Sequence, residues 1–296
     1  MSYCIYEVDR EKRIATLTFN RPEKLNALVP MDDLEEVIDR LYEADRDNDV
    51  AVVVMKGAGR AFGSGYDIDA VRARRGFTEE KRPPQRRRYW GVDEWWGRRG
   101  ILQKILTCDK VTIAQVHGYC YGGHFEMMCA CDMAIASKDA LFTHPGYTYL
   151  GIEGPIPLYV LMIGWRRVKE MMLLGKPLTA KEAHEFGLVN RVVSLEKLEK
   201  EVAQIAETIA SRPLDGIVMG KKEFQMAMDI MGLSAGYDLA SISHTLMSNL
   251  KFEPGEFNLM RELKDKGRKG MYSSRDERYS DQAWRDKDAK KTTKKK

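Results

Sequence analysis

Two glycine-rich turns hold the residues of this sequence that are best suited to chemistry. The first is the Phe-Gly-Ser-Gly-Tyr-Asp-Ile segment at 62–68, and the second is the His-Gly-Tyr-Cys-Tyr-Gly-Gly-His-Phe-Glu segment at 117–126. Each follows an apolar, β-branched run, which predicts a buried strand. Glycine lets a backbone N–H approach a ligand oxygen closely, and a helix start adds a positive dipole. The two turns together look like two halves of one oxyanion hole, able to stabilise the enolate of an activated carbonyl.

Strands and helices alternate around these turns. The runs that predict strands are 13–19, 51–55, 111–116, 133–136 and 189–193, and the segments with helical spacing between them are 32–44, 167–174 and 180–186. This alternation predicts an α/β fold with parallel strand pairing. Beyond Ser194 only helix-period segments follow, at 195–211 and 214–231. We therefore expect a core over 1–195, a helical C-terminal region over 196–270 and a basic, disordered tail over 271–296.

Composition limits the class of protein. No apolar run approaches the roughly 20 residues needed to cross a bilayer, and the N-terminus lacks a signal-peptide layout, so we expect a cytoplasmic protein without a membrane partner. Five cysteines, an odd number, indicate reduced thiols, and the lone Cys129/Cys131 pair predicts no metal site. The net charge of +4 and the lysine-rich end favour a solvated tail over a nucleic-acid arm. The arginine- and tryptophan-rich segment 72–99 predicts a long loop leading into a helix, either a binding lid or a surface insertion.

Four segments, in order, resemble the signatures of the crotonase (enoyl-CoA hydratase/isomerase) superfamily. They are 20–28, 62–68, 118–126 and 130–136, and the stretch 175–190 is also similar. The resemblance covers about residues 5–270. It implies a spiral of ββα units with a helical C-terminal region that forms trimers, often paired into hexamers.

The resemblance also implies roles for single residues. The backbone N–H groups of Tyr66 and Gly123 would be the oxyanion donors, and Glu126 would be the acid/base; a helix-start carboxylate with a purely structural role is the alternative for Glu126. The positions implied to bind coenzyme A or the acyl group are Lys24, Ala27, Ser64, Gly65, Asp67, Ile68, Gly122, His124 and Tyr237. Asp67 also suits a helix N-cap. His124 replaces the usual glycine and could narrow the pocket or donate a hydrogen bond, and Tyr237 resembles a tyrosine of hydroxycinnamoyl-CoA hydratase-lyases.

The sequence departs from the hydratases at the second glutamate. That position holds Gly146, which cannot transfer a proton, and Glu153 is a candidate replacement. His144 is a further polar group in this stretch, for which we expect a structural role. Hydration of a 2-enoyl-CoA is the best single reaction, with double-bond isomerisation and hydrolase or lyase cleavage of a ring or aromatic acyl-CoA as alternatives. The expected substrate is then an acyl-CoA thioester, and we expect no metal or redox cofactor. The alternative to an enzyme is a homologue that has no catalytic activity and binds RNA.

Overall fold

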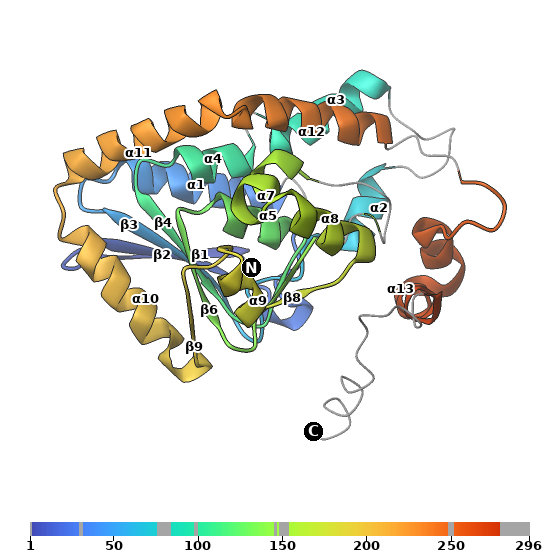
Figure 1. The fold of residues 1–296 in the computed structure, drawn as a ribbon, viewed down its shortest axis with the longest axis horizontal. Coiled ribbons are helices and arrows are strands. Elements are labelled where there is room, and N and C mark those ends of the chain that lie inside the picture. The colour runs from blue at the N-terminus through green and yellow to red at the C-terminus, as the bar shows by residue number, and fades with distance from the viewer. Residues whose placement is uncertain are drawn as a thin grey trace.

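The computed structural model describes residues 2–29, 32–75, 84–97, 100–144, 147, 154–247 and 252–278. Within these ranges six strands form one sheet in the order β1-β2-β3-β4-β6-β9 (Figure 1). Their bounds are β1 (Cys4–Asp9), β2 (Ile14–Phe19), β3 (Val52–Gly57), β4 (Val111–Val116), β6 (Met133–Ser137) and β9 (Arg191–Val193). β1 and β2 pair antiparallel, and each later pair is parallel. The predicted α/β fold with parallel pairing is confirmed.

Alternate residues of β3 serve two different apolar layers. Val53 and Met55 belong to the main core, whereas Val52 and Val54 belong to a second cluster with Leu198 and other residues of α10 (Leu195–Ala210). A strand buried on both faces has side chains that alternate in this way. Helices α1 (Asp32–Arg46), α4 (Ile101–Thr107) and α5 (Gly123–Ala130) pack into the main core. The sheet is therefore covered on both faces, and α5 lies inside the molecule.

A second, smaller sheet carries the other glycine turn. It contains β5 (Tyr119–Tyr121), β7 (Leu141–Thr143) and β8 (Leu178–Thr179), with β5 parallel to β7 and β7 antiparallel to β8. These strands have two or three residues each, too few to produce a period in the sequence. β5 lies inside the segment that we expected to be only a turn.

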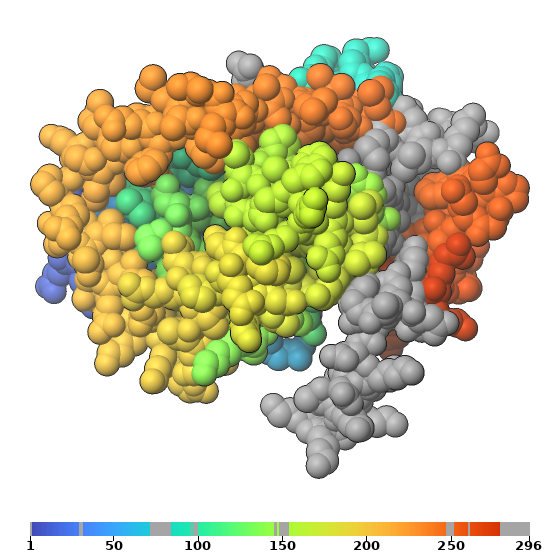
Figure 2. Space-filling model, in the orientation of Figure 1, coloured from blue at the N-terminus to red at the C-terminus, as the bar shows by residue number. Residues whose placement is uncertain are grey.

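Helices complete the described chain. Around the sheets they are the 3₁₀ turn η1 (Pro22–Lys24), α2 (Ile68–Arg75), α3 (Gln85–Trp96), α7 (Ile156–Ile163), α8 (Trp165–Leu174) and α9 (Ala180–Glu185). The C-terminal ones after α10 are α11 (Leu214–Ile230), α12 (Leu233–Met247) and α13 (Leu259–Arg278). In Figures 1 and 2, α11 and α12 run as one band along an edge of the molecule. None of the helices in the described ranges has the length and apolar content to cross a membrane.

Two boundaries differ from the expectation. A loop was expected from residue 72, whereas α2 continues to Arg75; the helix expected at the end of this segment is α3. A tail was expected from residue 271, whereas α13 continues to Arg278 and buries Met271 with Leu259 and Leu263. Residues 279–296 lie outside the described ranges. In α13, apolar packing accompanies the helix within a segment whose composition is strongly charged.

Candidate active site

The two glycine turns are hydrogen-bonded to each other. The Gly63 amide donates to the Tyr119 carbonyl at 2.8 Å, and the Tyr121 amide donates to the Gly63 carbonyl at 3.0 Å. Gly65 has a φ of +90°, and a Cβ on it would lie 2.9 Å from the Tyr121 carbonyl oxygen. Only glycine permits this backbone with so close an approach. The turns thus meet at one place, as their sequences suggested.

The 20–28 segment is hydrogen-bonded to the first turn. Leu28 donates from its amide to the Gly65 carbonyl at 2.8 Å and accepts from the Asp67 amide at 2.7 Å. Asn26 is fully buried, and its Nδ2 donates to the carbonyls of Ala58 and Ala61 at 2.9 Å each. Sequence reasoning did not single out Asn26. Its left-handed φ of +57° and its partners more than 30 residues away have no local sequence signal.

The residues implied to bind coenzyme A gather along this junction. Lys24 Nζ lies 2.9 Å from Asp67 Oδ2, and Asp67 Oδ1 accepts from the amides of Asp69 and Ala70 at the start of α2. Burial opposes ionisation of Asp67, but these hydrogen bonds outweigh it and lower the pKa of the carboxyl. Asp67 is therefore the N-cap of α2 and is paired with a lysine. Ala27, Ser64, Gly65 and Ile68 lie on the same two segments.

His124 lies beneath the first turn. Its ring is fully buried among Tyr3, Phe19 and Phe62. Nδ1 accepts a hydrogen bond from the Gly65 amide at 3.1 Å, and Nε2 lies 2.9 Å from the Tyr3 hydroxyl. Burial lowers the pKa of His124 to about 3, so the ring is neutral at physiological pH. The structure thus places His124 beneath the Gly65 backbone, which it supports, and not at a pocket wall. The ring accepts a hydrogen bond from the turn, whereas a donated one was one expectation.

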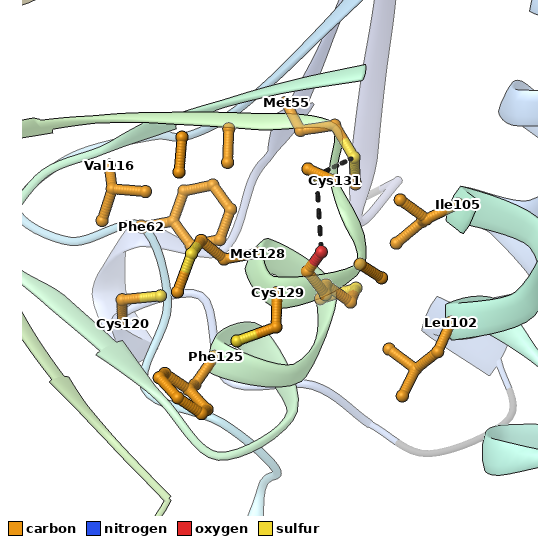
Figure 3. Packing of buried hydrophobic residues seen from close by; sticks show 14 of the residues in the cluster. Met55, Phe62, Leu102, Ile105, Val116, Cys120, Phe125, Met128, Cys129 and Cys131 are labelled. Atoms are coloured by element: carbon orange, nitrogen blue, oxygen red, sulfur yellow. Dashed lines mark hydrogen bonds between the residues drawn. The ribbon is translucent and has the colours of Figure 1, made fainter. Parts of the chain in front are cut away.

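Helix α5 starts at the second turn and is buried along its whole length. Gly122, with a φ of +53°, precedes it, and all eight of its residues are buried. Figure 3 shows its neighbours, including Phe62, Leu102 and Ile105. Cys131 follows the helix, and its thiol contacts Met55 Sδ and the Met127 carbonyl. Gly123 is the first residue of α5, so its N–H has no acceptor within the helix.

Glu126 carries its carboxylate into this interior. Its side chain is 1% exposed, and its two oxygens contact different groups. The Tyr66 hydroxyl donates to Oε2 at 3.0 Å, and His144 Nε2 lies 2.8 Å from Oε1. A buried charge needs such partners to be stable. Sequence reasoning did not find the Tyr66 side chain or the role of His144, because both contacts join residues far apart in the chain.

The Tyr66 ring lies between Trp95 and the second turn. It stacks on the Trp95 indole with centroids 5.0 Å apart and an interplanar angle of 10°. A Cβ on Gly123 would lie only 2.7 Å from Tyr66 Cζ, so the ring packs directly against that glycine. Trp95 itself is buried, whereas Trp90 of the same helix is 58% exposed. Helix α3 thus contributes one wall of the site.

Two further tyrosines surround Glu126. Tyr159 and Tyr237 are fully buried, and within the described residues neither hydroxyl has a hydrogen-bond partner. Burial raises the pKa of both phenols well above its usual range; the charge of Glu126 adds to this effect. The Tyr159 hydroxyl and Glu126 Oε1 both lie within 3 Å of the point where a Cβ of Gly154 would be. Gly146 and Glu153 lie outside the described residues, so the prediction for Glu153 stays a prediction.

The fold and this site define the class of protein. The chain matches the enoyl-CoA hydratase/isomerase family model over residues 9–255, and it belongs to that family, within the crotonase superfamily.

Relatives and solved structures agree. The chain is 32% identical to the mevalonyl-coenzyme A hydratase of Aspergillus fumigatus over 77% of each chain, and 29% identical to a 4-chlorobenzoyl coenzyme A dehalogenase of Arthrobacter over 72% of this chain and 76% of that one. An enoyl-CoA hydratase/isomerase from Xanthobacter autotrophicus superposes with a TM-score of 0.77 at 30% identity, covering 94% of this chain and 98% of that one. The relatives thus include enzymes of more than one reaction, so membership of the family does not fix which reaction this chain catalyses.

Proposed function

We propose that this enzyme hydrates a 2-enoyl-CoA thioester. The observation that carries the proposal is the buried Glu126 carboxylate, placed in the first turn of α5 where the two glycine turns meet. A thioester carbonyl held at that junction would bring its α and β carbons near this carboxylate. Glu126 then exchanges protons with water and the substrate as general acid/base.

The N–H groups of Tyr66 and Gly123 form the proposed oxyanion hole. Gly123 supports this role because it begins a buried helix, whose N-terminus favours negative charge. Negative charge grows on the thioester oxygen as the enolate forms, and donors fixed in a buried site stabilise that charge strongly. The Tyr66 ring packs against Gly123 in this structure, so substrate entry requires the ring to shift.

Coenzyme A is the proposed carrier of the substrate and not a separate cofactor. Lys24 supports this, because its ammonium is half exposed beside the first turn and can reach a phosphate while Asp67 holds it in place. Ala27, Ser64 and Ile68 lie on the same segments and would contact the nucleotide and pantetheine.

Aromatic side chains around Glu126 favour a bulky acyl group. Tyr66, Trp95, Tyr159 and Tyr237 come from four different segments. Apolar rings with a few polar atoms are typical of a pocket that binds a flat or cyclic ligand. Isomerisation of a double bond is the second candidate reaction, because one carboxylate suffices to move a proton between two carbons and Gly146 supplies none.

Incubation with thioesters in deuterated water tests the proposal. The panel contains 2-enoyl-, 3-enoyl-, aromatic and cyclic acyl-CoA, with mass spectrometry as the readout. A gain of one water supports hydration, deuterium incorporation without that gain supports isomerisation, and loss of a fragment supports a lyase. Recovery of every thioester unchanged and unlabelled contradicts the enzyme, and salt-sensitive RNA binding would then be the next measurement.

We also propose that the chain forms a homo-oligomer, a trimer or a hexamer, through α11 and α12. Seven large apolar side chains of these helices are 49–86% exposed: Met219, Phe224, Met226, Ile230, Leu239, Ile242 and Leu246. Exposed apolar side chains gathered on two helices are typical of an interface, and Figure 2 shows α11 and α12 together at the surface.

A further inference from the structure

His144 contacts the carboxylate on which the proposed chemistry depends. Its Nε2 lies 2.8 Å from Glu126 Oε1, and both side chains are almost fully buried, with 8% and 1% exposure. A carboxylate only accepts hydrogen bonds, so Nε2 carries the proton. The remaining nitrogen, Nδ1, is buried and has no hydrogen-bond partner within the described residues. In His124, by contrast, both nitrogens have partners, Gly65 and Tyr3.

The two oxygens of Glu126 have different surroundings. Oε1 lies beside His144, next to Gly154 and the Tyr159 hydroxyl. Oε2 accepts from Tyr66, whose ring packs on Gly123, the residue proposed to bind the thioester oxygen. Oε2 is therefore on the side from which a substrate would approach, and Oε1 is on the side of the imidazole.

We propose that His144 and Glu126 act as one proton-transfer pair, in which the imidazole can transfer a proton reversibly to the carboxylate. This inference rests on the proposed function, because it takes Glu126 as the group that exchanges protons with substrate. When the ring is doubly protonated, transfer across the 2.8 Å contact breaks the Nε2–H bond of the imidazolium, forms an Oε1–H bond and leaves a neutral imidazole. Glu126 changes from base to acid, and the pair gains or loses no proton.

The pair supplies what Gly146 cannot. Hydration needs one group to accept a proton from water as its oxygen bonds to the β carbon, and a source of the proton that goes to the α carbon. Glu126 accepts the water proton at Oε2 and delivers one proton to the α carbon, and the proton lent by the imidazolium to Oε1 returns to Nε2. The enzyme returns to its starting state, and water has added across the double bond without a further reactant.

Other titratable groups around the pair do not duplicate this role. Among the described residues, the titratable neighbours of Glu126 include Tyr66, Tyr159, Tyr237 and Cys129, from the first turn, α7, α12 and α5. Burial raises the pKa of Tyr159, Tyr237 and Cys129 well above the ordinary values, so these groups stay protonated.

The test compares His144→Gln with wild type and with His184→Gln, an exposed histidine outside the site. The glutamine amide can still donate to Oε1 but cannot carry the second proton. We expect hydration of 2-butenoyl-CoA or cinnamoyl-CoA to lose about 100-fold or more in kcat, with KM nearly unchanged, and one limb of the pH–rate profile to disappear. His184→Gln should keep the wild-type profile. A His144→Gln enzyme with wild-type kcat and both limbs overturns the proposal.

An NMR measurement separates failure of this inference from failure of the proposed function. In protein with ¹⁵N-labelled histidine, we expect a low-field Nε2–H signal that is absent in His144→Gln and displaced in Glu126→Gln. A signal unaffected by Glu126→Gln overturns the pair even if hydration is observed. If no thioester is converted but the signal behaves as expected, the pair exists and the hydratase function is at fault. Circular dichroism on each variant excludes loss of folding as the cause.

Discussion

The Tyr66 hydroxyl donates to Glu126 Oε2 at 3.0 Å, although the two residues are 60 positions apart. The contact joins the residue proposed to supply a backbone oxyanion donor to the residue proposed to move protons. One residue thus touches both parts of the mechanism, by its main chain and by its side chain. The consequences can be separated by substitution.

Replacing Glu126 with glutamine removes the proton-transfer group and keeps the shape. We expect kcat to fall by about 100- to 10,000-fold, because general acid/base catalysis contributes that much. Binding of the thioester, measured by calorimetry, should be retained. Unchanged turnover would remove Glu126 from the mechanism.

Replacing Tyr66 with phenylalanine separates its two roles. The backbone N–H and the stack on Trp95 remain, and the hydrogen bond to Glu126 is lost. A hydrogen bond to a charged group contributes about 1.5–3 kcal/mol, so unfolding by urea should show a loss of that order. We expect kcat to decrease less than in Glu126→Gln. An equal loss would mean that the phenol itself takes part in the chemistry.

Gly65→Ala tests the contact between the two turns. The new Cβ would lie 2.9 Å from the Tyr121 carbonyl oxygen on a backbone with a φ of +90°. We expect a loss of more than about 1 kcal/mol in stability and a large fall in kcat, because the turn must move. Gly91→Ala is the matched control, since nothing lies within 4 Å of its Cβ position in helix α3. That variant should be as stable as wild type or more so, by thermal melting.

His124 makes stability depend on pH in a defined direction. Its pKa is about 3 when folded and near 6.5 when unfolded, so below pH 6.5 the unfolded chain binds a proton that the folded chain does not. The contribution of the neutral His124 ring to the free energy of unfolding is fully present above pH 6.5. It decreases as the pH falls toward 3, by at most about 1.4 kcal/mol per pH unit. In His124→Gln, this part of the dependence of the unfolding free energy on pH should be absent. Parallel urea curves for both proteins from pH 7 to 4.5 would contradict the assignment.

Charged substitutions on α11 test the proposed interface. Phe224 and Ile230 are 76% and 86% exposed in the single chain. The double change to glutamate should shift the mass measured by light scattering toward the 33.9 kDa of one chain. Lys200→Glu, a charge change on the exposed side of α10, should leave the oligomer intact. A wild type that is already monomeric would disprove the interface.

The sequence predicted most of the large sheet and fewer of the site contacts. Apolar runs such as 111–116 predict strands because burial on both faces leaves a continuous signal. The strand β5 has three residues and forms only because it pairs with β7 and touches Gly63. The His144 contact with Glu126 arises from that same pairing, which brings the end of β7 beside α5. Such contacts depend on tertiary arrangement and have no local pattern.

The complete burial of α5 has a consequence for how this protein can change. A helix enclosed on every side tolerates few substitutions, because each one alters packing against several neighbours. New substrate preferences are therefore expected to arise from the segments that surround Glu126, such as those carrying Trp95, Tyr159 and Tyr237. The helix thus holds one carboxylate in a fixed position, while we expect the side chains that face this carboxylate to determine which reaction it catalyses.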